Sequence, residues 1–290
     1  MKENASVALL IREALQEDIG KGDLTTRLCI PKERRCRGKV IVREEAVVAG
    51  LWLLPLIFNR LDRKVKVRLL AKEGKKVPRN ELLATLEGPA GSILTGERVS
   101  LNFLSHLFGI ATLTRRYLQQ VKPYRMKILA TRKTTPGWRF LEKYAVQMGG
   151  GEIHRMGLYD EVLVKENHLL IASKSWRHAD TLRGWIQKVR RGVPKGIKIV
   201  VEAQTLREAR GLLSASVDKI LLDNLTPKQI RKVVLLRNRK GKRPLLQASG
   251  GVTLETIRKI AGTGIEEVSV GRLTHSAPAV NISVDIDKIR

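Results

Sequence analysis

The pattern of apolar and polar positions changes along the chain, and its first part mixes two periods. A helical period over Val7–Glu17 precedes short runs in which apolar and polar residues alternate. In Val65–Leu70, apolar and basic residues alternate with period two, as in a strand with one exposed face. We also predict strands over Arg37–Arg43 and Glu81–Glu87, and a helix over the longer segment Glu97–Val121. The pattern therefore predicts an N-terminal domain of helices and half-exposed strands.

From Lys127 onward the chain repeats strand, loop and helix. Apolar runs that end in polar or glycine residues recur six times: Ile128–Lys133, Val162–His168, Ile197–Gln204, Ile220–Asn224, Leu245–Gly251 and Glu267–Leu273. Helical segments such as Thr226–Asn238, with Pro227 in its first turn, and Thr253–Ala261 lie between most of them. This alternation implies parallel strands buried on both faces. Because a complete barrel has eight strands, we expect a reduced or open α/β barrel whose carboxyl strand ends form the site.

The change of pattern also divides the chain. We predict a first domain over residues 1–110 and the barrel over residues 111–275. The tail Ala277–Ile286 alternates again like a half-buried strand, so the segment 276–290 is predicted to return to the sheet of the first domain.

The composition is that of an ordinary globular enzyme in every respect but charge. The 290 residues are 43% hydrophobic, and no apolar run reaches the roughly 20 residues that cross a bilayer. The N-terminal segment reads as an amphipathic helix, so we expect neither a signal peptide nor a membrane partner. Cys29 and Cys36 have no neighbouring Cys or His ligand, which favours two free thiols and a cytoplasmic location.

The formal charge of +27 raises the question of a nucleic-acid partner. The basic residues are spread over the whole length, however, and aromatic residues, which would stack on bases, make up only 4% of the chain. We expect a basic surface that binds polyanions weakly and no specific nucleic acid. A basic nucleic-acid-binding protein remains one alternative.

Chemically distinct groups of residues follow the predicted strands in order. The first two runs and their connection contribute cations: Arg132, Lys133, His154, Arg155 and Lys165. The middle two contribute the carboxylates of Glu202 and Asp223, which suit Mg²⁺ or sugar hydroxyls. The last two contribute the small-residue loops Ser249–Gly251 and Ser269–Gly271, whose backbone can approach a phosphate. Together they predict a site for a phosphorylated sugar and an anionic acceptor.

Each group taken alone has a simpler interpretation. Arg132 and Lys133 could be structural ion-pair partners, and Asp223–Asn224 could cap a helix. The histidines are expected to serve local structure: His106 in a helix core, His168 and His275 in local hydrogen bonds, and His178 on a solvated helix face. The functional interpretation depends on the joint pattern at successive strand ends.

Long motifs in this chain resemble those of the quinolinate phosphoribosyltransferases, the decarboxylating nicotinate-nucleotide pyrophosphorylases of NAD biosynthesis. The resemblance begins at LQEDIGKGDLTT and is densest in TRKTTPG, GGGEIHRMGLYDEVLVKENH, LLDN, ASGG and VGRLTHSAPAVNIS. It implies an N-terminal α/β sandwich followed by an incomplete, roughly six-stranded α/β barrel. The implied reaction transfers phosphoribosyl from phosphoribosyl pyrophosphate to quinolinate, giving nicotinate mononucleotide, CO₂ and pyrophosphate.

The resemblance also implies roles for individual residues. The quinolinate pocket would be lined by cations: Arg98, Arg132, His154, Arg155 and Lys165. Lys133 would lie between acceptor and donor, and Glu202 and Asp223 would hold ribose hydroxyls or Mg²⁺, the implied cofactor. Ser249, Gly250, Gly251, Ser269 and Gly271 would hold the 5′-phosphate. The implied assembly is a homodimer, or a higher oligomer, in which Arg98 enters the neighbouring subunit's pocket.

Three positions depart from the family pattern. Ala130, Gln204 and Gln247 stand where family members often have acids, so all three remove negative charge near the predicted mouth of the barrel and bear on the implied metal environment. A same-fold paralogue associated with molybdenum transport is the nearest rival. Lys165 favours the quinolinate enzyme, because the rival pattern usually lacks a cation there.

Overall fold

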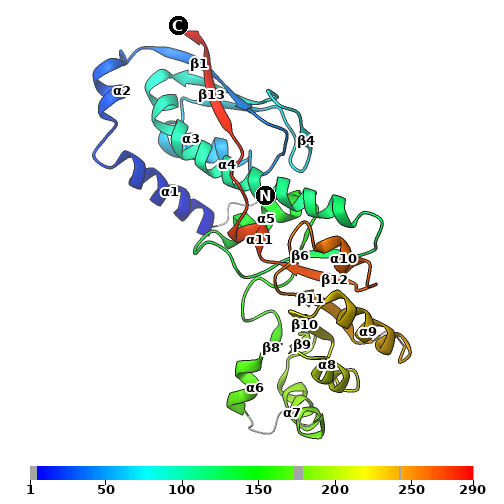
Figure 1. Ribbon diagram of the computed structural model, residues 1–290. Coiled ribbons are helices and arrows are strands. Elements are labelled where there is room, and N and C mark those ends of the chain that lie inside the picture. The colour runs from blue at the N-terminus through cyan, green and yellow to red at the C-terminus, as the bar shows by residue number, and fades with distance from the viewer. Residues whose placement is uncertain (1–4, 173–178, 242, 290) are drawn as a thin grey trace. The chain divides into compact units, whose positions relative to one another are not determined.

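The computed structural model describes residues 5–172, 179–241 and 243–289, so His178 lies outside the described residues (Figure 1). The chain forms two compact units. Unit 1 comprises Met1–Arg115, Thr134–Gly150 and Leu273–Arg290, and unit 2 comprises Arg116–Lys133 and Gly151–Arg272. The domain division between residues 110 and 111 stays a prediction, because compactness alone does not define an independently folding domain. None of the described helices is both long and apolar enough to cross a membrane.

Unit 1 is built on a four-stranded antiparallel sheet with the order β13-β1-β5-β3. Its elements, in chain order, are α1 (Ala5–Ile19), α2 (Leu24–Cys29), β1 (Arg35–Val42), β2 (Ala46–Val47), α3 (Leu53–Leu61), β3 (Lys66–Leu69), β4 (Lys76–Val77), β5 (Leu82–Pro89), α4 (Ala90–Val121), α5 (Arg139–Met148), α11 (Arg272–His275) and β13 (Ile282–Ile289). Helix α4 continues into unit 2, and α11 begins at Arg272, which is the last residue of unit 2. In β1 every second residue is buried, because one face of the sheet covers a core that includes Val40, Phe58 and Ile93.

Strand β13 is joined to β1 by ion pairs as well as by the backbone ladder. Arg37 and Lys39 of β1 both bind Asp287, with Lys39 Nζ 3.0 Å from the carboxylate. The hydrogen bond from Arg37 is the main reason why the pKa of Asp287 lies below its ordinary value. The strand begins at Ile282, later than the predicted Ala277, because residues before it make no ladder with β1.

Unit 2 contains a seven-stranded parallel sheet with the order β7-β6-β12-β11-β10-β9-β8. Its elements are β6 (Lys127–Ala130), β7 (Glu152–Ile153), β8 (Val162–Val164), α6 (Glu166–Ala172), α7 (Ala179–Gly192), β9 (Ile199–Ala203), α8 (Leu206–Leu212), β10 (Lys219–Asp223), α9 (Pro227–Asn238), β11 (Leu245–Ser249), α10 (Ile257–Ala261) and β12 (Glu267–Val270). Strands β7 and β8 form its two edges, so this is an incomplete α/β barrel. The predicted count of six was one too low, because β7 has only two residues and carries no apolar run.

The sequence reasons for these elements are local. All five residues of β9 are buried, as expected for a parallel strand covered on both faces. Helix α9 begins with a capping box between Thr226 and Gln229, and Pro227 occupies its first turn. The predicted helix Thr253–Ala261 is shorter, starting at Ile257, because Thr253 and Thr256 close a turn before it.

Candidate active site

The carboxyl ends of the strands in unit 2 surround a cavity of about 510 Å³. Most of the predicted site residues line it: Arg132, Lys133, His154, Arg155, Lys165, Asp223, Ser249, Gly250, Gly251 and Ser269. The strands end earlier than the predicted runs, since β6 stops at Ala130 and β8 at Val164. The cations therefore stand in the loops immediately after the strands, and their side chains line the cavity.

The strand register explains why these residues share one face. Leu221 of β10 lies opposite Glu202 of β9, and Asp223 lies opposite Ser249 of β11. Side chains two residues apart along a strand point to the same side of the sheet. Glu202, Leu221, Asp223 and Ser249 therefore lie on the inner face, together with Lys165 at the end of β8.

Three predicted residues are not among those that line this cavity. Glu202 lies directly behind it: the carboxylate is 3.3 Å from the ammonium of Lys165, and the residue is buried. Gly271 follows β12 by one residue. Arg98 lies on α4 in unit 1, where its side chain is exposed, so unit 2 does not bring it to the other residues.

The structure adds lining residues that were not selected from the sequence. Thr131, Leu163, Leu221 and Asn224 also face the cavity. Thr131 Oγ1 accepts a hydrogen bond from the backbone N–H of Lys133 at 3.1 Å and so shapes the loop after β6. Period two would have identified Leu163 and Leu221, because each stands two residues before a predicted site residue.

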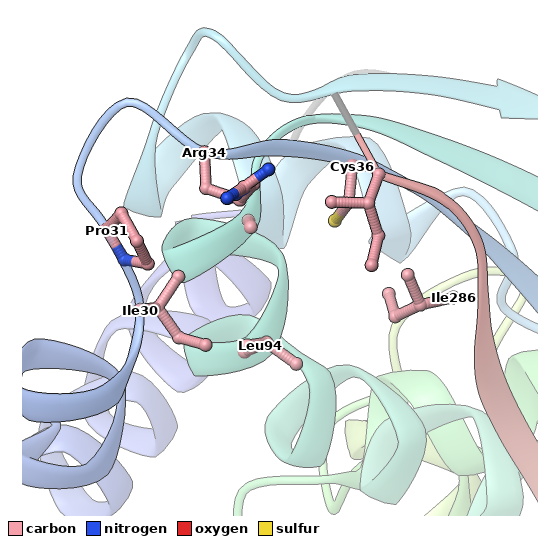
Figure 2. Close-up of a pocket in the computed structure, with 8 residues that line it drawn as sticks. Ile30, Pro31, Arg34, Cys36, Leu94 and Ile286 are labelled. Carbon is pink, nitrogen blue, oxygen red and sulfur yellow. The ribbon is translucent and has the colours of Figure 1, made fainter.

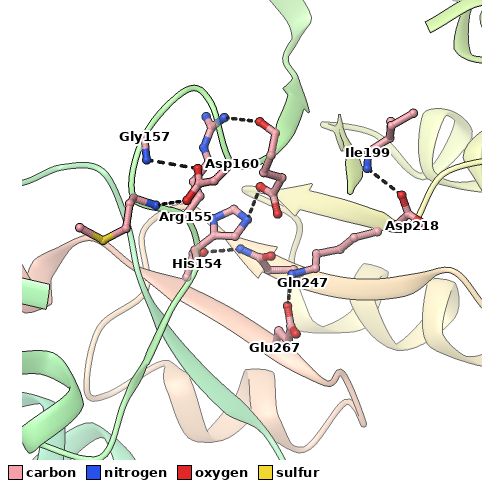
Figure 3. A network of polar contacts seen from close by, with 12 residues as sticks. His154, Arg155, Gly157, Asp160, Ile199, Asp218, Gln247 and Glu267 are labelled. Atoms are coloured by element: carbon pink, nitrogen blue, oxygen red, sulfur yellow. Dashed lines mark hydrogen bonds and ion pairs between the residues drawn. The ribbon is translucent and has the colours of Figure 1, made fainter. Parts of the chain in front are cut away.

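His154 and Arg155 belong to a loop that is closed on itself (Figure 3). The carboxylate of Asp160 accepts hydrogen bonds from the backbone N–H groups of Met156, at 2.5 Å, and Gly157, at 3.2 Å. Arg155 Nη1 donates to the main-chain oxygen of Glu161 at 3.1 Å. Burial, and then the neighbouring Arg132, lower the pKa of Arg155 below its ordinary value.

The loops after β10 and β11 fit closely together. Asn224, with a positive φ of 55°, donates from Nδ2 to Asp223 Oδ2 at 2.9 Å, and its backbone N–H donates to the carbonyl of Ser249 at 2.8 Å. Gly250 has a φ of +90°, and a Cβ there would lie 2.1 Å from Asn224 Oδ1. At Gly251, with a φ of +58°, a Cβ would meet nothing within 4 Å. The loop thus brings bare backbone to the cavity, as a phosphate site requires.

The three departures from the family pattern have different surroundings. Gln204 donates from Nε2 to Glu202 Oε1 at 3.3 Å, so its amide still contacts the carboxylate behind the cavity. Gln247 is fully buried and donates from Nε2 to Ser269 Oγ. Ala130 is fully buried in β6. Two of the three positions therefore retain polar contacts with predicted site residues.

The predicted local roles of His168 and His275 are confirmed. His168 Nδ1 accepts from the Lys165 N–H at 3.0 Å, and His275 Nδ1 lies 2.6 Å from Ser276 Oγ. His106 is half-buried in unit 1, where Nε2 lies 2.9 Å from the buried carboxylate of Glu142. It packs edge-on against Trp138 as well.

Unit 1 has a cavity of similar volume and opposite character (Figure 2). Its 490 Å³ are lined by apolar side chains such as Ile30, Leu94 and Ile286, with Arg34 as the charged residue of the lining. An apolar wall leaves the charges of a polyanion without partners, and desolvating them there costs free energy. The cationic cavity of unit 2 is therefore the candidate active site.

The arrangement in unit 2 suits a substrate pair with several negative charges. Arginine and lysine side chains bind carboxylates and phosphates through charge-assisted hydrogen bonds, each contributing roughly 1.5–3 kcal/mol. Glycine backbone and the hydroxyls of Ser249 and Ser269 supply neutral donors on the opposite strands. The two halves could hold an acidic acceptor and a phosphorylated sugar in contact.

The donor set for a metal is small. Among the described residues, no group of three or more His, Cys, Asp or Glu side chains could hold an ion. Asp223 faces the cavity and Glu202 lies behind Lys165. Mg²⁺ is commonly held by one or two carboxylates together with substrate phosphates and water, and these residues fit that mode rather than a closed protein cage.

Comparisons with known proteins give matches over nearly the whole chain. Sequence profiles of the quinolinate phosphoribosyl transferase N-terminal and C-terminal domains match residues 23–108 and 110–285. A protein of Bacillus subtilis named as a probable nicotinate-nucleotide pyrophosphorylase [carboxylating] is 38% identical over 277 residues, covering 96% of this chain and 92% of that protein. A tobacco protein named quinolinate phosphoribosyltransferase [decarboxylating] 1b is 35% identical over 290 residues, covering 96% and 81%.

Solved structures show the same likeness over whole chains. The nicotinate-nucleotide pyrophosphorylase from Francisella tularensis superposes with a TM-score of 0.89 at 34% identity, covering 99% of this chain and 98% of that one. The enzyme of that name from Ehrlichia chaffeensis gives a TM-score of 0.89 at 38% identity, covering 99% and 100%. The profiles span both parts of the sequence and the relatives match almost end to end, so this chain belongs to the quinolinate phosphoribosyl transferase family.

Proposed function

We propose that this chain transfers phosphoribosyl from phosphoribosyl pyrophosphate to quinolinate and releases CO₂, pyrophosphate and nicotinate mononucleotide, a step of de novo NAD biosynthesis. The observation that carries the proposal is the cationic cavity of unit 2, with its glycine loops on neighbouring strands. Family membership supplies the reaction, and the cavity supplies groups of the right charge. Two free cysteines, Cys29 and Cys36, are compatible with a reducing cytoplasm.

The acceptor half uses charge to select a diacid. Quinolinate carries two carboxylates at neutral pH, and Arg132, His154, Arg155 and Lys165 provide donors for both. Arg155 is buried, so its charge is costly without an anion beside it. An acceptor with a single carboxylate makes fewer contacts with these cations than quinolinate does.

The donor half uses backbone and carboxylates. Gly250 and Gly251 let N–H groups approach the 5′-phosphate, and Ser249 and Ser269 add hydroxyls. Asp223, which lines the cavity, and Glu202, which contacts Lys165, would bind the ribose hydroxyls. Asn224 keeps Asp223 oriented through its 2.9 Å hydrogen bond.

The proposed reaction uses the groups of both halves. The pyridine nitrogen attacks the anomeric carbon of the ribose as the bond to pyrophosphate breaks, and positive charge builds on the sugar. Lys133, between the two halves, stabilises the negative charge on the departing pyrophosphate. The pyridinium that forms accepts the electron pair of the adjacent carbon–carboxylate bond, so CO₂ leaves and a proton takes its place.

Mg²⁺ is part of this proposal as a partner of the donor's phosphates. Glu202 and Asp223 are the residues that would hold it, and when bound it would neutralise charge on the pyrophosphate. Removal of the ion with EDTA should abolish turnover and leave the melting temperature unchanged, because no described cluster makes the ion part of the fold.

One assay tests the proposed function. Purified protein is incubated with quinolinate, phosphoribosyl pyrophosphate and Mg²⁺, and nicotinate mononucleotide is measured. Nicotinate serves as the matched acceptor and should react at least roughly 100-fold more slowly, since its single carboxylate makes fewer charge-assisted contacts with the cavity cations. Equal rates with the two acids would contradict the diacid assignment.

We further propose a two-fold dimer in which Arg98 completes the partner's acceptor pocket. The support is that Arg98 lies exposed on α4 of unit 1, whereas the other acceptor cations belong to unit 2. Reciprocal exchange is natural to a two-fold interface. Co-expression of Arg98→Ala and Lys133→Ala chains should then give mixed dimers with about half of wild-type activity. Inactive mixed dimers, identified by differential tags, would rule out the exchange.

A further inference from the structure

The loop between β7 and β8 contains a buried carboxylate that the reaction described above does not use. Glu161 stands immediately before β8, and its side chain is only 6% exposed. Its Oε1 lies 2.7 Å from Nε2 of His154, whose side chain is 8% exposed. Figure 3 shows this contact beside the bond that joins Arg155 to the main chain of the same residue.

The carboxylate lies behind the cavity rather than in it. His154 and Arg155 line the cavity, and Glu161 is not among the lining residues. This placement is chemically sensible, because a carboxylate that faced a dianionic acceptor would repel it, whereas one behind the imidazole acts only on the ring. A buried carboxylate is also costly unless a cation or donor accompanies it, and His154 is that group.

We propose that Glu161 is a positioning residue: its carboxylate fixes the orientation of the His154 ring, so that the ring presents its remaining nitrogen to an acceptor carboxylate. This inference rests on the proposed function. In the structure the two atoms are in contact, but their angle does not make a hydrogen bond. Such bonds are often poorly aligned in ligand-free sites and tighten when substrate binds.

Two features isolate the effect of the side chain. Arg155 is held by the main-chain oxygen of Glu161, which every substitution retains. The turn before it is closed by Asp160 through the N–H groups of Met156 and Gly157, again without the Glu161 carboxylate. Removal of the carboxylate should therefore release the His154 ring and leave the rest of the loop in place.

The test compares Michaelis constants for the two substrates. In Glu161→Ala, the KM for quinolinate should rise about tenfold, the size expected for one charge-assisted hydrogen bond, while kcat and the KM for phosphoribosyl pyrophosphate stay within about twofold. Glu161→Gln should recover most of the affinity, because its amide oxygen can still accept from Nε2. Glu152→Gln is the control, since Glu152 is an exposed carboxylate that pairs with Lys127 at the start of the neighbouring strands.

A double-mutant cycle separates positioning from a merely structural role. His154→Ala should raise the KM for quinolinate at least as much as Glu161→Ala, and the double variant should be no worse than His154→Ala alone. Additive effects, or equal increases in both KM values, would overturn the proposal. If Glu161→Ala does not fold, Glu161→Asp takes its place in the cycle, because the shorter side chain withdraws the carboxylate from the ring.

The proposed function is checked separately in the same experiment. Wild-type protein that forms no nicotinate mononucleotide would contradict the reaction itself. Wild-type turnover combined with an unchanged KM in Glu161→Ala would contradict the role of Glu161 alone.

Discussion

The two ends of the parallel sheet in unit 2 use the same kinds of residue for different purposes. At the amino-terminal end, each of several cations meets a carboxylate: Lys219 with Glu267, Arg237 with Glu266, Arg190 with Asp218 at 2.7 Å, and Lys127 with Glu152 at 3.1 Å. At the carboxyl end, the cavity lining contains Arg132, Lys133, Arg155 and Lys165 but a single carboxylate, Asp223. One end is close to electrically balanced, and the other has a surplus of positive charge.

This difference separates stability from function. A buried cation held by a carboxylate, such as Lys219, contributes to the fold, whereas Lys165, which contacts Glu202, keeps about half of its side chain exposed, so a ligand can reach it. A concave surface with surplus positive charge lowers its free energy when an anion binds. The repulsion among its cations is offset by the stability of the rest of the molecule. Substitutions at the two ends should therefore affect different measurements.

The largest effect is expected at the paired end. Lys219 is 5% exposed in its side chain and binds Glu267, so Lys219→Met leaves a largely buried carboxylate without its cation. The free energy of unfolding should fall by about 3–5 kcal/mol, with both KM values unchanged in the folded protein. Lys127→Met, which breaks an exposed pair, is the control and should cost less than about 1 kcal/mol. Urea denaturation measures both, and an altered KM in Lys219→Met would weaken the comparison.

The opposite result is expected at the cavity. Lys133→Ala and Lys165→Ala should each lower kcat/KM by about 100-fold or more, equivalent to around 3 kcal/mol of transition-state stabilisation. Their melting temperatures should stay close to that of the wild type. Near-normal activity in both variants would return these lysines to the class of structural cations.

The glycine loop allows a sharper test, because its two glycines differ in their surroundings. Gly250→Ala places a Cβ against Asn224, so it should destabilise the protein by about 2–3 kcal/mol and raise the KM for phosphoribosyl pyrophosphate. Gly251→Ala has open space and only backbone strain, of about 1–2 kcal/mol. Similar KM values for the two variants would show that the Asn224 contact does not shape the donor site.

The smallest effect is expected in the loss of stability at acidic pH. Burial alone would raise the pKa of Asp218, but the Ile199 N–H and the Arg190 guanidinium outweigh it and hold the pKa below its ordinary value of 3.8. A lowered folded-state pKa contributes stability above the unfolded-state value and loses it as pH falls through the folded-state value. Unfolding measured between about pH 5 and pH 2 should show a shallower loss in Asp218→Asn than in wild type. Parallel curves would exclude this contribution.

The sequence predicted the fold well where periodicity is long. The strands β9 and β10 contain the apolar runs Ile199–Val201 and Ile220–Leu222, and α9 has a capping box and a first-turn proline, so their type could be predicted directly. The two-residue strand β7 could not, because no period exists over two residues. The late start of β13 depends on pairing with β1, and the paired residues lie 240 or more positions apart in the sequence.

The residues that line the site could be predicted from the sequence, but the contacts that hold them in place could not. Cations at the ends of apolar runs pointed to the cavity, yet Lys219 and Lys127 also flank apolar runs and serve the other end of the sheet. Which end a cation occupies depends on strand direction, which the alternation of strands and helices supplies. The contact between Glu161 and His154 depends on the closure of a loop, and nothing in the local sequence specifies that closure.

The position of β13 has a consequence for how the protein is made. This strand covers one side of β1 but follows the whole parallel sheet of unit 2 in the sequence, so β1 waits for its neighbour until that sheet has been synthesised. During that interval the backbone N–H and C=O groups on one side of β1 are open to pairing with other chains. A polypeptide that ends shortly before Ile282 would contain all the strands of unit 2, but the antiparallel sheet of unit 1 would have β1 as an uncovered edge. Such truncated chains should aggregate, and a synthetic peptide with the sequence of β13, added in trans, should suppress the aggregation.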